Sequence, residues 1–235
     1  MSDAVKLIEV KEDIQADNER VARELRARLA ARKTFLLNVM SGPGAGKTST
    51  ILRTVEELRG RLRFGVLEAD IESTVDAERV AACGIRAVQL RTGGLCHLDA
   101  TMVEQGLEAL GLDGLDVVII ENVGNLVCPA EFDTGAMRNV MLLSVPEGDD
   151  KPLKYPLMFS VVDALLINKV DYLALSDFDI AAVRERVRKI NPRVRVFEIS
   201  AKTGQGVREW AEWLRGEVET VVGSAAQAES HPGRA

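Results

Sequence analysis

The sequence predicts an α/β fold, a doubly wound and mostly parallel sheet of about seven strands flanked by helices. Short apolar runs alternate with longer amphipathic segments, an order typical of parallel strands joined by helical crossovers. Val117–Ile120 and Ala164–Ile167 are continuously apolar, which indicates strands buried on both faces. A glycine-rich loop between the first strand and a helix-like stretch indicates the P-loop branch of this fold.

The elements follow one another in a regular order. An amphipathic helix is expected from about Ile8 to Arg32, because Ile14, Val21, Leu25 and Leu29 recur near helical spacing. This helix either packs on the domain or docks a partner, and packing is the simpler expectation. Strands are expected at residues 34–40, 62–69, 86–91, 116–121, 139–145, 162–167 and 194–199. Helices are expected at residues 47–59, 73–82, 98–110, 176–190 and 206–222.

Composition excludes several classes of protein. The chain has 235 residues, 46% hydrophobic and 28% charged, which suits one globular α/β core. Its net charge is −6 and no stretch is densely basic, so nucleic-acid binding is not expected. No apolar run is long enough for a membrane span or resembles a signal peptide. Three cysteines favour a reducing compartment, and we therefore expect a cytoplasmic protein.

The glycine-rich loop reads Ser41-Gly42-Pro43-Gly44-Ala45-Gly46-Lys47-Thr48. Its glycines let successive backbone N–H groups approach a ligand, and the following helix N-terminus adds a positive dipole, so the loop is suited to phosphate. Lys47 would reach the β- and γ-phosphates, and the Thr48 hydroxyl would bind Mg²⁺. The usual first residue, most often Gly, is here Ser41. The predicted phosphate-binding residues are Gly42, Gly44, Ala45, Gly46, Lys47, Thr48 and Ser49.

The base is indicated by Asn168-Lys169-Val170-Asp171 and Ser200-Ala201-Lys202, each at the end of a predicted strand. An Asp carboxylate accepts guanine N1–H and the exocyclic amine, whereas adenine offers no such donor pair and leaves the buried carboxylate unpaired. A backbone amide of the second segment would reach guanine O6. Either segment alone is weak, but together and in this order they favour GTP. The predicted base-binding residues are Asn168, Lys169, Asp171, Ser200, Ala201 and Lys202.

These motifs divide the chain into three parts. Residues 34–222 form the predicted GTP-binding domain, and residues 1–33 form the N-terminal amphipathic helix. Residues 223–235 are rich in Gly, Ser, Ala and Gln and are expected to be a disordered tail.

Carboxylates at strand ends are candidates for Mg²⁺ binding and water orientation. Asp70 and Glu121 each follow an apolar run, although such acids also commonly close a strand in solvent. Gly124 supplies a backbone amide able to sense a γ-phosphate. Glu68 and Asp76 are weaker candidates, and Asp76 could instead be an acid of a first helical turn. Lys47, Asp70 and Glu121 are thus the predicted catalytic residues, and Thr48, Asp70 and Glu121 the predicted Mg²⁺ ligands.

A second cluster contains thiols. Cys96 and His97 follow one predicted strand and Cys128 follows another, so both loops emerge at the same edge of a parallel sheet. Thiolates and imidazole suit Zn²⁺, Ni²⁺ or Cu rather than Mg²⁺. The spacing alone is weak, because free buried cysteines are common. Cys83 is expected to be a small core residue, and His231 has no evident role.

Taken together, these segments resemble the nickel-incorporation accessory GTPases of hydrogenase maturation (HypB type). The similarity spans roughly residues 10–222, and its Cys-His and Glu-Asn-Val-Gly-Asn-Leu-Val-Cys-Pro segments are specific. Urease accessory GTPases resemble it too, but their metal motif is similar to Cys-Pro-His on one loop. The matching stretches are Asn38–Thr48, Asp70-Ile71, Asp76–Arg79, Cys96–Ala100, Glu121–Pro129, Ser144–Pro156 and Asn168–Asp171.

The resemblance implies a homodimer formed on GTP or metal binding, with Cys96, His97 and Cys128 of two subunits building a Ni²⁺ or Zn²⁺ site at the interface. It also implies nickel delivery to a hydrogenase large-subunit precursor, with a partner nickel metallochaperone. Many relatives carry an N-terminal cysteine-rich or histidine-rich nickel motif, and Met1–Arg32 contains neither. The interface site is therefore the one metal site expected.

Two rival functions remain at this point. One is another nickel or cobalamin-associated accessory GTPase, of which the urease type is the first example. The other is a metal-dependent dimerisation scaffold whose GTP hydrolysis is incidental. No arginine finger is readable in the sequence, so slow hydrolysis would not separate these alternatives.

Overall fold

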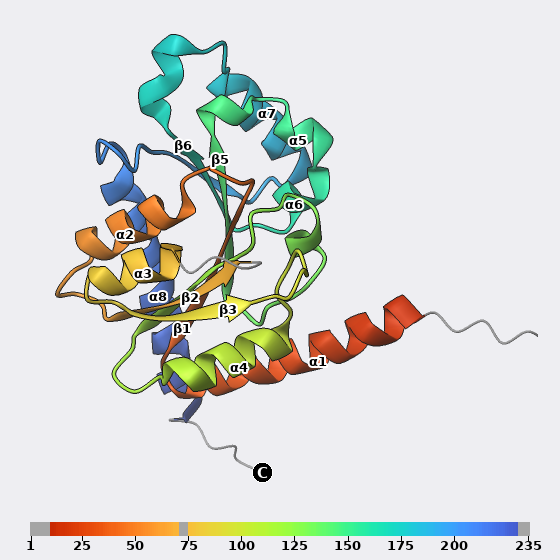
Figure 1. Cartoon of the computed structure of the whole chain (residues 1–235), viewed down its shortest axis with the longest axis vertical. Coiled ribbons are helices and arrows are strands. Elements are labelled where there is room, and N and C mark those ends of the chain that lie inside the picture. Colours follow the sequence, from red (N-terminus) through yellow and green to blue (C-terminus); the bar gives the residue numbers. More distant parts are fainter. Residues whose placement is uncertain (1–9, 71–74, 230–235) are drawn as a thin grey trace, which may run out of the picture.

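The structure is a computed structural model that describes residues 10–70 and 75–229. Seven strands form one sheet in the order β3-β2-β4-β1-β5-β6-β7, and every neighbouring pair is parallel (Figure 1). The doubly wound α/β prediction is confirmed, and within the described residues the sheet is wholly parallel. The strands are β1 (Phe35–Ser41), β2 (Phe64–Asp70), β3 (Arg86–Arg91), β4 (Val117–Glu121), β5 (Arg138–Ser144), β6 (Ala164–Asn168) and β7 (Arg195–Glu198).

Helices connect the strands. The longer helices are α1 (Val10–Ala31), α2 (Lys47–Glu57), α3 (Val75–Ala82), α4 (Ala100–Leu110), α7 (Ile180–Ile190) and α8 (Val207–Glu229). Five short elements were not expected from the sequence, because each is too short to show a helical period. They are η1 (Cys128–Ala130), η2 (Val145–Glu147), α5 (Lys151–Lys154), α6 (Pro156–Ser160) and η3 (Val170–Leu175). Among the described residues, no helix combines the length and apolar character needed to cross a membrane.

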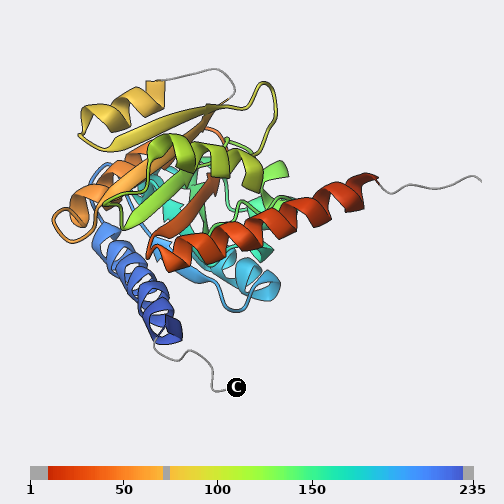
Figure 2. The same ribbon diagram turned by 90° about the horizontal axis from the view of Figure 1, so that it is seen from below.

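Helices cover both faces of the sheet, as Figures 1 and 2 show. The alternation of side chains along β1 assigns each helix to a face. Phe35, Leu37 and Val39 pack with α2, α3 and α8, whereas Leu36 packs with α1 and α4. Met40 packs with α6 and α7. Every residue of β1 is buried, which explains the continuous apolar run seen in the sequence.

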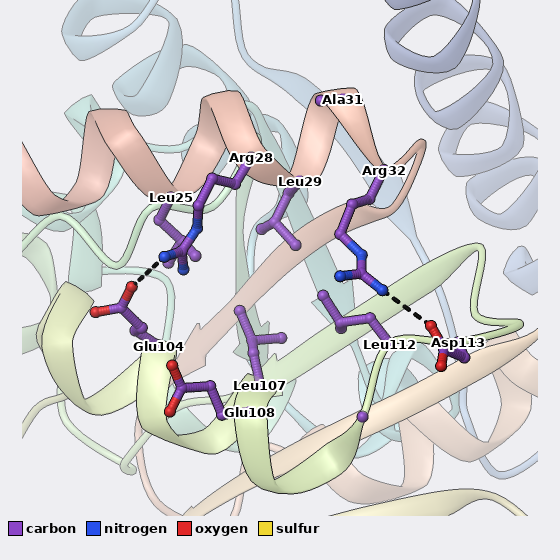
Figure 3. Close-up of a pocket in the computed structure, with 11 residues that line it drawn as sticks. Leu25, Arg28, Leu29, Ala31, Arg32, Glu104, Leu107, Glu108, Leu112 and Asp113 are labelled. Atoms are coloured by element: carbon purple, nitrogen blue, oxygen red, sulfur yellow. Dashed lines mark hydrogen bonds and ion pairs between the residues drawn. The ribbon is translucent and has the colours of Figure 1, made fainter.

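Helix α1 packs along α4. Leu25 and Leu29 of α1 are buried in the same cluster as Leu107 of α4. Two ion pairs flank this contact: Arg28–Glu104 at 2.6 Å and Arg32–Asp113 at 2.9 Å (Figure 3). Because at least one member of each pair is well exposed, each contributes little to stability, and the buried leucines hold the helix.

The predicted C-terminal boundary is wrong. Helix α8 continues to Glu229, past the disordered tail that was expected from residue 223. The reason lies in residues 225–229, which read Ala-Ala-Gln-Ala-Glu and are all strong helix formers. Residues 230–235, including His231, lie outside the described residues.

Trp210 of α8 anchors this helix to the sheet. Its side chain is fully buried, its Nε1–H donates to Thr54 Oγ1 of α2 at 2.9 Å, and its ring meets Phe197 of β7 edge-on. We expect Trp210→Ala to lower the free energy of unfolding by about 3–5 kcal/mol, because it leaves a large cavity. Urea unfolding measures this, with Leu175→Ala as control, since Leu175 is 84% exposed. A loss no larger than the control's would contradict the assignment.

Candidate functional site

The phosphate loop joins β1 to α2. Gly44 and Gly46 have φ of 72° and 98°, a left-handed conformation that favours glycine. A Cβ on Gly46 would also lie 2.7 Å from Asn168 Nδ2, so this position has room for glycine alone. Gly46 precedes α2 with no side-chain cap, which leaves the first backbone N–H groups of the helix available for an anion.

Two side chains of α2 point back into the loop region. Lys47 Nζ donates to Ser41 Oγ at 3.2 Å, so the residue that replaces the usual glycine holds the lysine. Thr48 Oγ1 donates to Glu121 Oε1 of β4 at 2.9 Å. Thr48 and Glu121 are both buried. The predicted phosphate-binding lysine and the predicted Mg²⁺-binding hydroxyl therefore lie at the carboxyl ends of β1 and β4.

Glu68 of β2 faces Glu121. The two residues are register partners on neighbouring parallel strands, and both are buried. Burial, followed by the charge of Glu121, raises the pKa of Glu68 to about 10. Burial also raises the pKa of Glu121, against the lowering effect of its hydrogen bonds and of Lys47. With a pKa of about 10, Glu68 keeps its proton at neutral pH in the absence of a metal ion.

This carboxyl pair is suited to Mg²⁺. Within the described residues, Glu68 Oε1 and Glu121 Oε2 are buried and accept no hydrogen bond from another group. Buried carboxylate oxygens beside the Thr48 hydroxyl are the hard oxygen ligands that Mg²⁺ prefers. Asp70, the other predicted ligand, lies two residues beyond Glu68 at the exposed end of β2. Glu68 was the weaker candidate in the sequence, because only the strand register reveals its pairing with Glu121.

Two further predicted residues take up defined positions. A Cβ on Gly124 would lie 3.2 Å from Pro43 Cα, so the segment after β4 runs against the phosphate loop. Asp76 lies in the first turn of α3 and pairs with Arg79 at 3.2 Å, as expected for a helix-start acid.

The two predicted base-binding segments meet beside the phosphate loop. Asn168 Nδ2 donates to Ala45 O at 2.8 Å, and its Oδ1 accepts the Ala201 N–H at 3.1 Å. Lys169 Nζ donates to Gly44 O at 2.7 Å. Asp171 Oδ1 accepts the Ser200 hydroxyl at 2.6 Å, which orients the carboxylate. Because Asn168 uses the Ala201 amide, a contact to guanine O6 would come from another amide of that loop.

Arg53 of α2 also supports this region, and sequence analysis missed it. Its guanidinium donates to Ala201 O at 3.0 Å and to Lys202 O at 3.3 Å. Helix α2 therefore fixes both the phosphate loop at its start and the second base segment along its length. The sequence does not reveal this contact, because Arg53 and Ala201 lie 148 residues apart in the chain.

Cys96, His97 and Cys128 converge within one chain. Their candidate ligand atoms all lie within 4.8 Å of one another, and the two sulfur atoms are 2.7 Å apart. Two loops that follow β3 and β4 bring them together, as the parallel-sheet argument predicted. Asn125 joins these loops, since its Nδ2 donates to Cys96 O at 3.4 Å and its Oδ1 accepts the Val127 N–H.

The environment of His97 favours its neutral form. The imidazole stacks on Phe132, with ring centroids 3.7 Å apart and planes 11° from parallel. Burial lowers the pKa of His97, although Asp99 and Glu131 oppose this effect. Its buried Nδ1 has no hydrogen-bond partner among the described residues. A neutral imidazole with a free nitrogen beside two thiols forms a soft N/S donor set that fits Ni²⁺ or Zn²⁺.

The third cysteine does not follow its prediction. Cys83 is exposed just beyond the end of α3, and not in the core as expected. The reason is the turn at Gly84, whose φ of 77° lets the chain leave the helix there.

Comparison with known proteins supports the geometry. The family described as "CobW/HypB/UreG, nucleotide-binding domain" matches residues 35–198. The hydrogenase maturation factor HypB of Azotobacter chroococcum is 47% identical over 210 residues, covering 89% of this chain and 68% of the relative. The hydrogenase/urease maturation factor HypB of Helicobacter pylori is 39% identical over 211 residues, covering 88% and 86%. A crystal structure of Helicobacter pylori HypB in complex with nickel superposes with a TM-score of 0.82 at 38% identity, covering 87% of this chain and 96% of that one.

The carboxyl pair should make stability depend on pH. Glu68 has an ordinary pKa of 4.5 and a pKa of about 10 in the fold. Between these values the folded chain holds a proton that the unfolded chain has released, so the free energy of unfolding falls as pH rises. Glu68→Gln is neutral throughout and should be more stable than the parent at pH 9, by at least about 1 kcal/mol. Urea unfolding at pH 6 and 9, without nucleotide or Mg²⁺, measures this.

The control for that experiment is Glu19→Gln, because Glu19 is exposed on α1. It should leave the pH dependence of stability unchanged. Parallel stability curves for Glu68→Gln and the parent would show that Glu68 does not hold the extra proton.

Proposed function

The chain belongs to the HypB group of the CobW/HypB/UreG nucleotide-binding family, and from this premise we propose that it is a GTP-hydrolysing metallochaperone. It binds nickel or zinc at Cys96, His97 and Cys128 and helps to insert nickel into the large subunit of a nickel–iron hydrogenase. The observation that carries the proposal is the placement of a phosphate loop and a cysteine–histidine cluster on adjoining loops of one sheet edge.

The nucleotide half of the proposal assigns GTP to the β1, β6 and β7 strand ends. The loop N–H groups and Lys47 hold the phosphates, and Asp171 accepts the guanine donors. Thr48, Glu121 and Asp70 would hold Mg²⁺, which would supply positive charge to the β- and γ-phosphate oxygens. Glu121 then orients the attacking water, because the Thr48 hydroxyl holds its carboxylate in place.

The metal half assigns Ni²⁺ or Zn²⁺ as cargo. Three ligands from one chain leave a position open, which a second copy or a receiving protein can fill. Two apolar side chains beside the ligands support a homodimer around this site: Leu95 and Val127 are 45% and 48% exposed next to Cys96 and Cys128. Dimerisation on GTP or metal binding would cover both and bring two clusters together.

The cellular role follows from family membership and not from the site. We propose a cytoplasmic protein that works with a partner nickel metallochaperone on a hydrogenase large-subunit precursor. A urease target is the second candidate, because the Helicobacter pylori relative is named a hydrogenase/urease maturation factor. Co-purification with each metal-free precursor separates the two targets.

One substitution in the nucleotide site and one in the metal site should separate GTP hydrolysis from nickel binding. Lys47→Ala should lower the rate of GTP hydrolysis by at least about 100-fold, because the lysine stabilises the transferring phosphoryl group. Cys128→Ala should leave that rate within twofold but lower Ni²⁺ affinity by at least about 10-fold. Phosphate release and chelator competition measure the two effects. Hydrolysis that survives in Lys47→Ala would refute the phosphate-loop assignment, and unchanged nickel affinity in Cys128→Ala would refute the metal site.

Nucleotide state should change nickel affinity. Gly124 packs on Pro43 of the phosphate loop, and the segment that follows it leads directly to Cys128, so a γ-phosphate that reorders Gly124 moves a metal ligand. We expect Ni²⁺ affinities for the GDP and the non-hydrolysable GTP states to differ by about 5-fold or more, the usual scale of such coupling. Chelator competition on both states measures this. Equal affinities would favour a scaffold whose GTP hydrolysis is incidental.

A further inference from the structure

One side chain of α1 joins the two loops that carry the cysteine–histidine cluster. Asn18 Nδ2 donates to Asp133 O at 2.9 Å, and Asn18 Oδ1 accepts the Ala100 N–H at 2.9 Å. A primary amide matches this pair because it presents one donor and one acceptor on the same planar group. Asn18 is therefore a bridge between segments that lie 82 and 115 residues away in the sequence.

Both anchor points lie next to metal ligands. Ala100 begins α4, three residues after His97, and Asp99 caps the same helix by accepting the Met102 N–H. The Ala100 N–H is one of the first-turn donors that a helix leaves unpaired, and Asn18 satisfies it. Asp133 follows Phe132, whose ring stacks on His97. Asn18 thus fixes the backbone on both sides of the His97–Phe132 contact.

A second side chain of α1 holds the same loop. Arg26 forms a bidentate pair with the Asp133 carboxylate at 2.8 and 2.6 Å, and its Nη1 also donates to Ala136 O at 3.2 Å. The pair is only about one-third exposed, and bidentate geometry is the strong form of this interaction. Leu25 and Leu29 are buried against α4 (Figure 3), so the helix that carries Asn18 is itself held in place by packing.

We propose that Asn18 is a positioning residue for the metal site. It touches no ligand atom, but it holds the loop that ends in α4 and the loop after β4 at the separation at which Cys96, His97 and Cys128 converge. Helix α1 then contributes to the metal site by positioning the two loops that carry its ligands. This inference rests on the proposed function, because it presupposes that the cluster binds nickel.

The test compares Asn18→Ala and Asn18→Asp with the parent in the full chain. Ala removes both hydrogen bonds while strengthening the helix, so weaker metal binding cannot come from weaker helix formation. Asp is nearly isosteric but replaces the donor with an oxygen that faces the Asp133 carbonyl. Substitution of such supporting residues typically lowers metal affinity by about 10- to 100-fold. We expect both variants to lose at least about 10-fold in Ni²⁺ affinity by chelator competition and to change the thiolate-to-nickel charge-transfer absorption.

The matched control is Glu19→Ala, the exposed neighbour on the same helix, which should keep parental affinity and absorption. Ni²⁺ affinities of both Asn18 variants within twofold of the parent would overturn the proposal. An equal loss of GTP-analogue affinity would overturn it as well, because that pattern indicates general destabilisation. If the parent and Cys128→Ala bind Ni²⁺ equally, the proposed metal site itself fails, and this result is distinct from a failure at Asn18.

Discussion

The parallel register of the sheet is the constraint on which the rest of the structure depends. Because all seven strands run the same way, their carboxyl ends share one edge, and every chemically distinctive segment follows such an end. The phosphate loop follows β1, the cysteine loops follow β3 and β4, and the base segments follow β6 and β7. A one-residue slip of β2 against β4 would separate Glu68 from Glu121 and turn one of them to the opposite face.

The same register also buries polar side chains inside the sheet, where a polar group without a hydrogen-bond partner costs free energy. Asn38 lies in the middle of β1 and is 1% exposed, yet its amide is paired on both sides. It donates to Asn139 Oδ1 at 3.0 Å and accepts from Asn122 Nδ2 at 3.1 Å. Asn122 follows Glu121 directly, so this network fixes the chain at the point where β4 delivers its carboxylate. A satisfied buried network favours one arrangement over others, since a shifted register leaves its members unpaired.

Sequence reasoning placed a segment correctly where one short motif stands at the end of a predicted strand. The phosphate loop, the Asn168–Asp171 segment and the convergence of Cys96 with Cys128 all follow from motifs placed at strand ends. It was weak for Glu68, whose role appears only through its strand partner, and it missed Asn18, whose partners are more than eighty residues away. It failed at the end of α8, where composition suggested disorder but helix propensity prevailed.

The two halves of the site are joined by a short physical path. Gly124 contacts the phosphate loop at Pro43, and the next residue, Asn125, binds Cys96 O and the Val127 N–H. Asn125 thus touches the loop of each thiol, while the residue before it lies against the phosphate loop. On the far side of the cluster, Asn18 and Arg26 hold the loop after β4 against α1. If Gly124 moves, these contacts with α1 oppose a shift of both loops together. Under the proposed function, such a movement would change the distance between the ligands, which is the physical requirement for nucleotide to control metal binding.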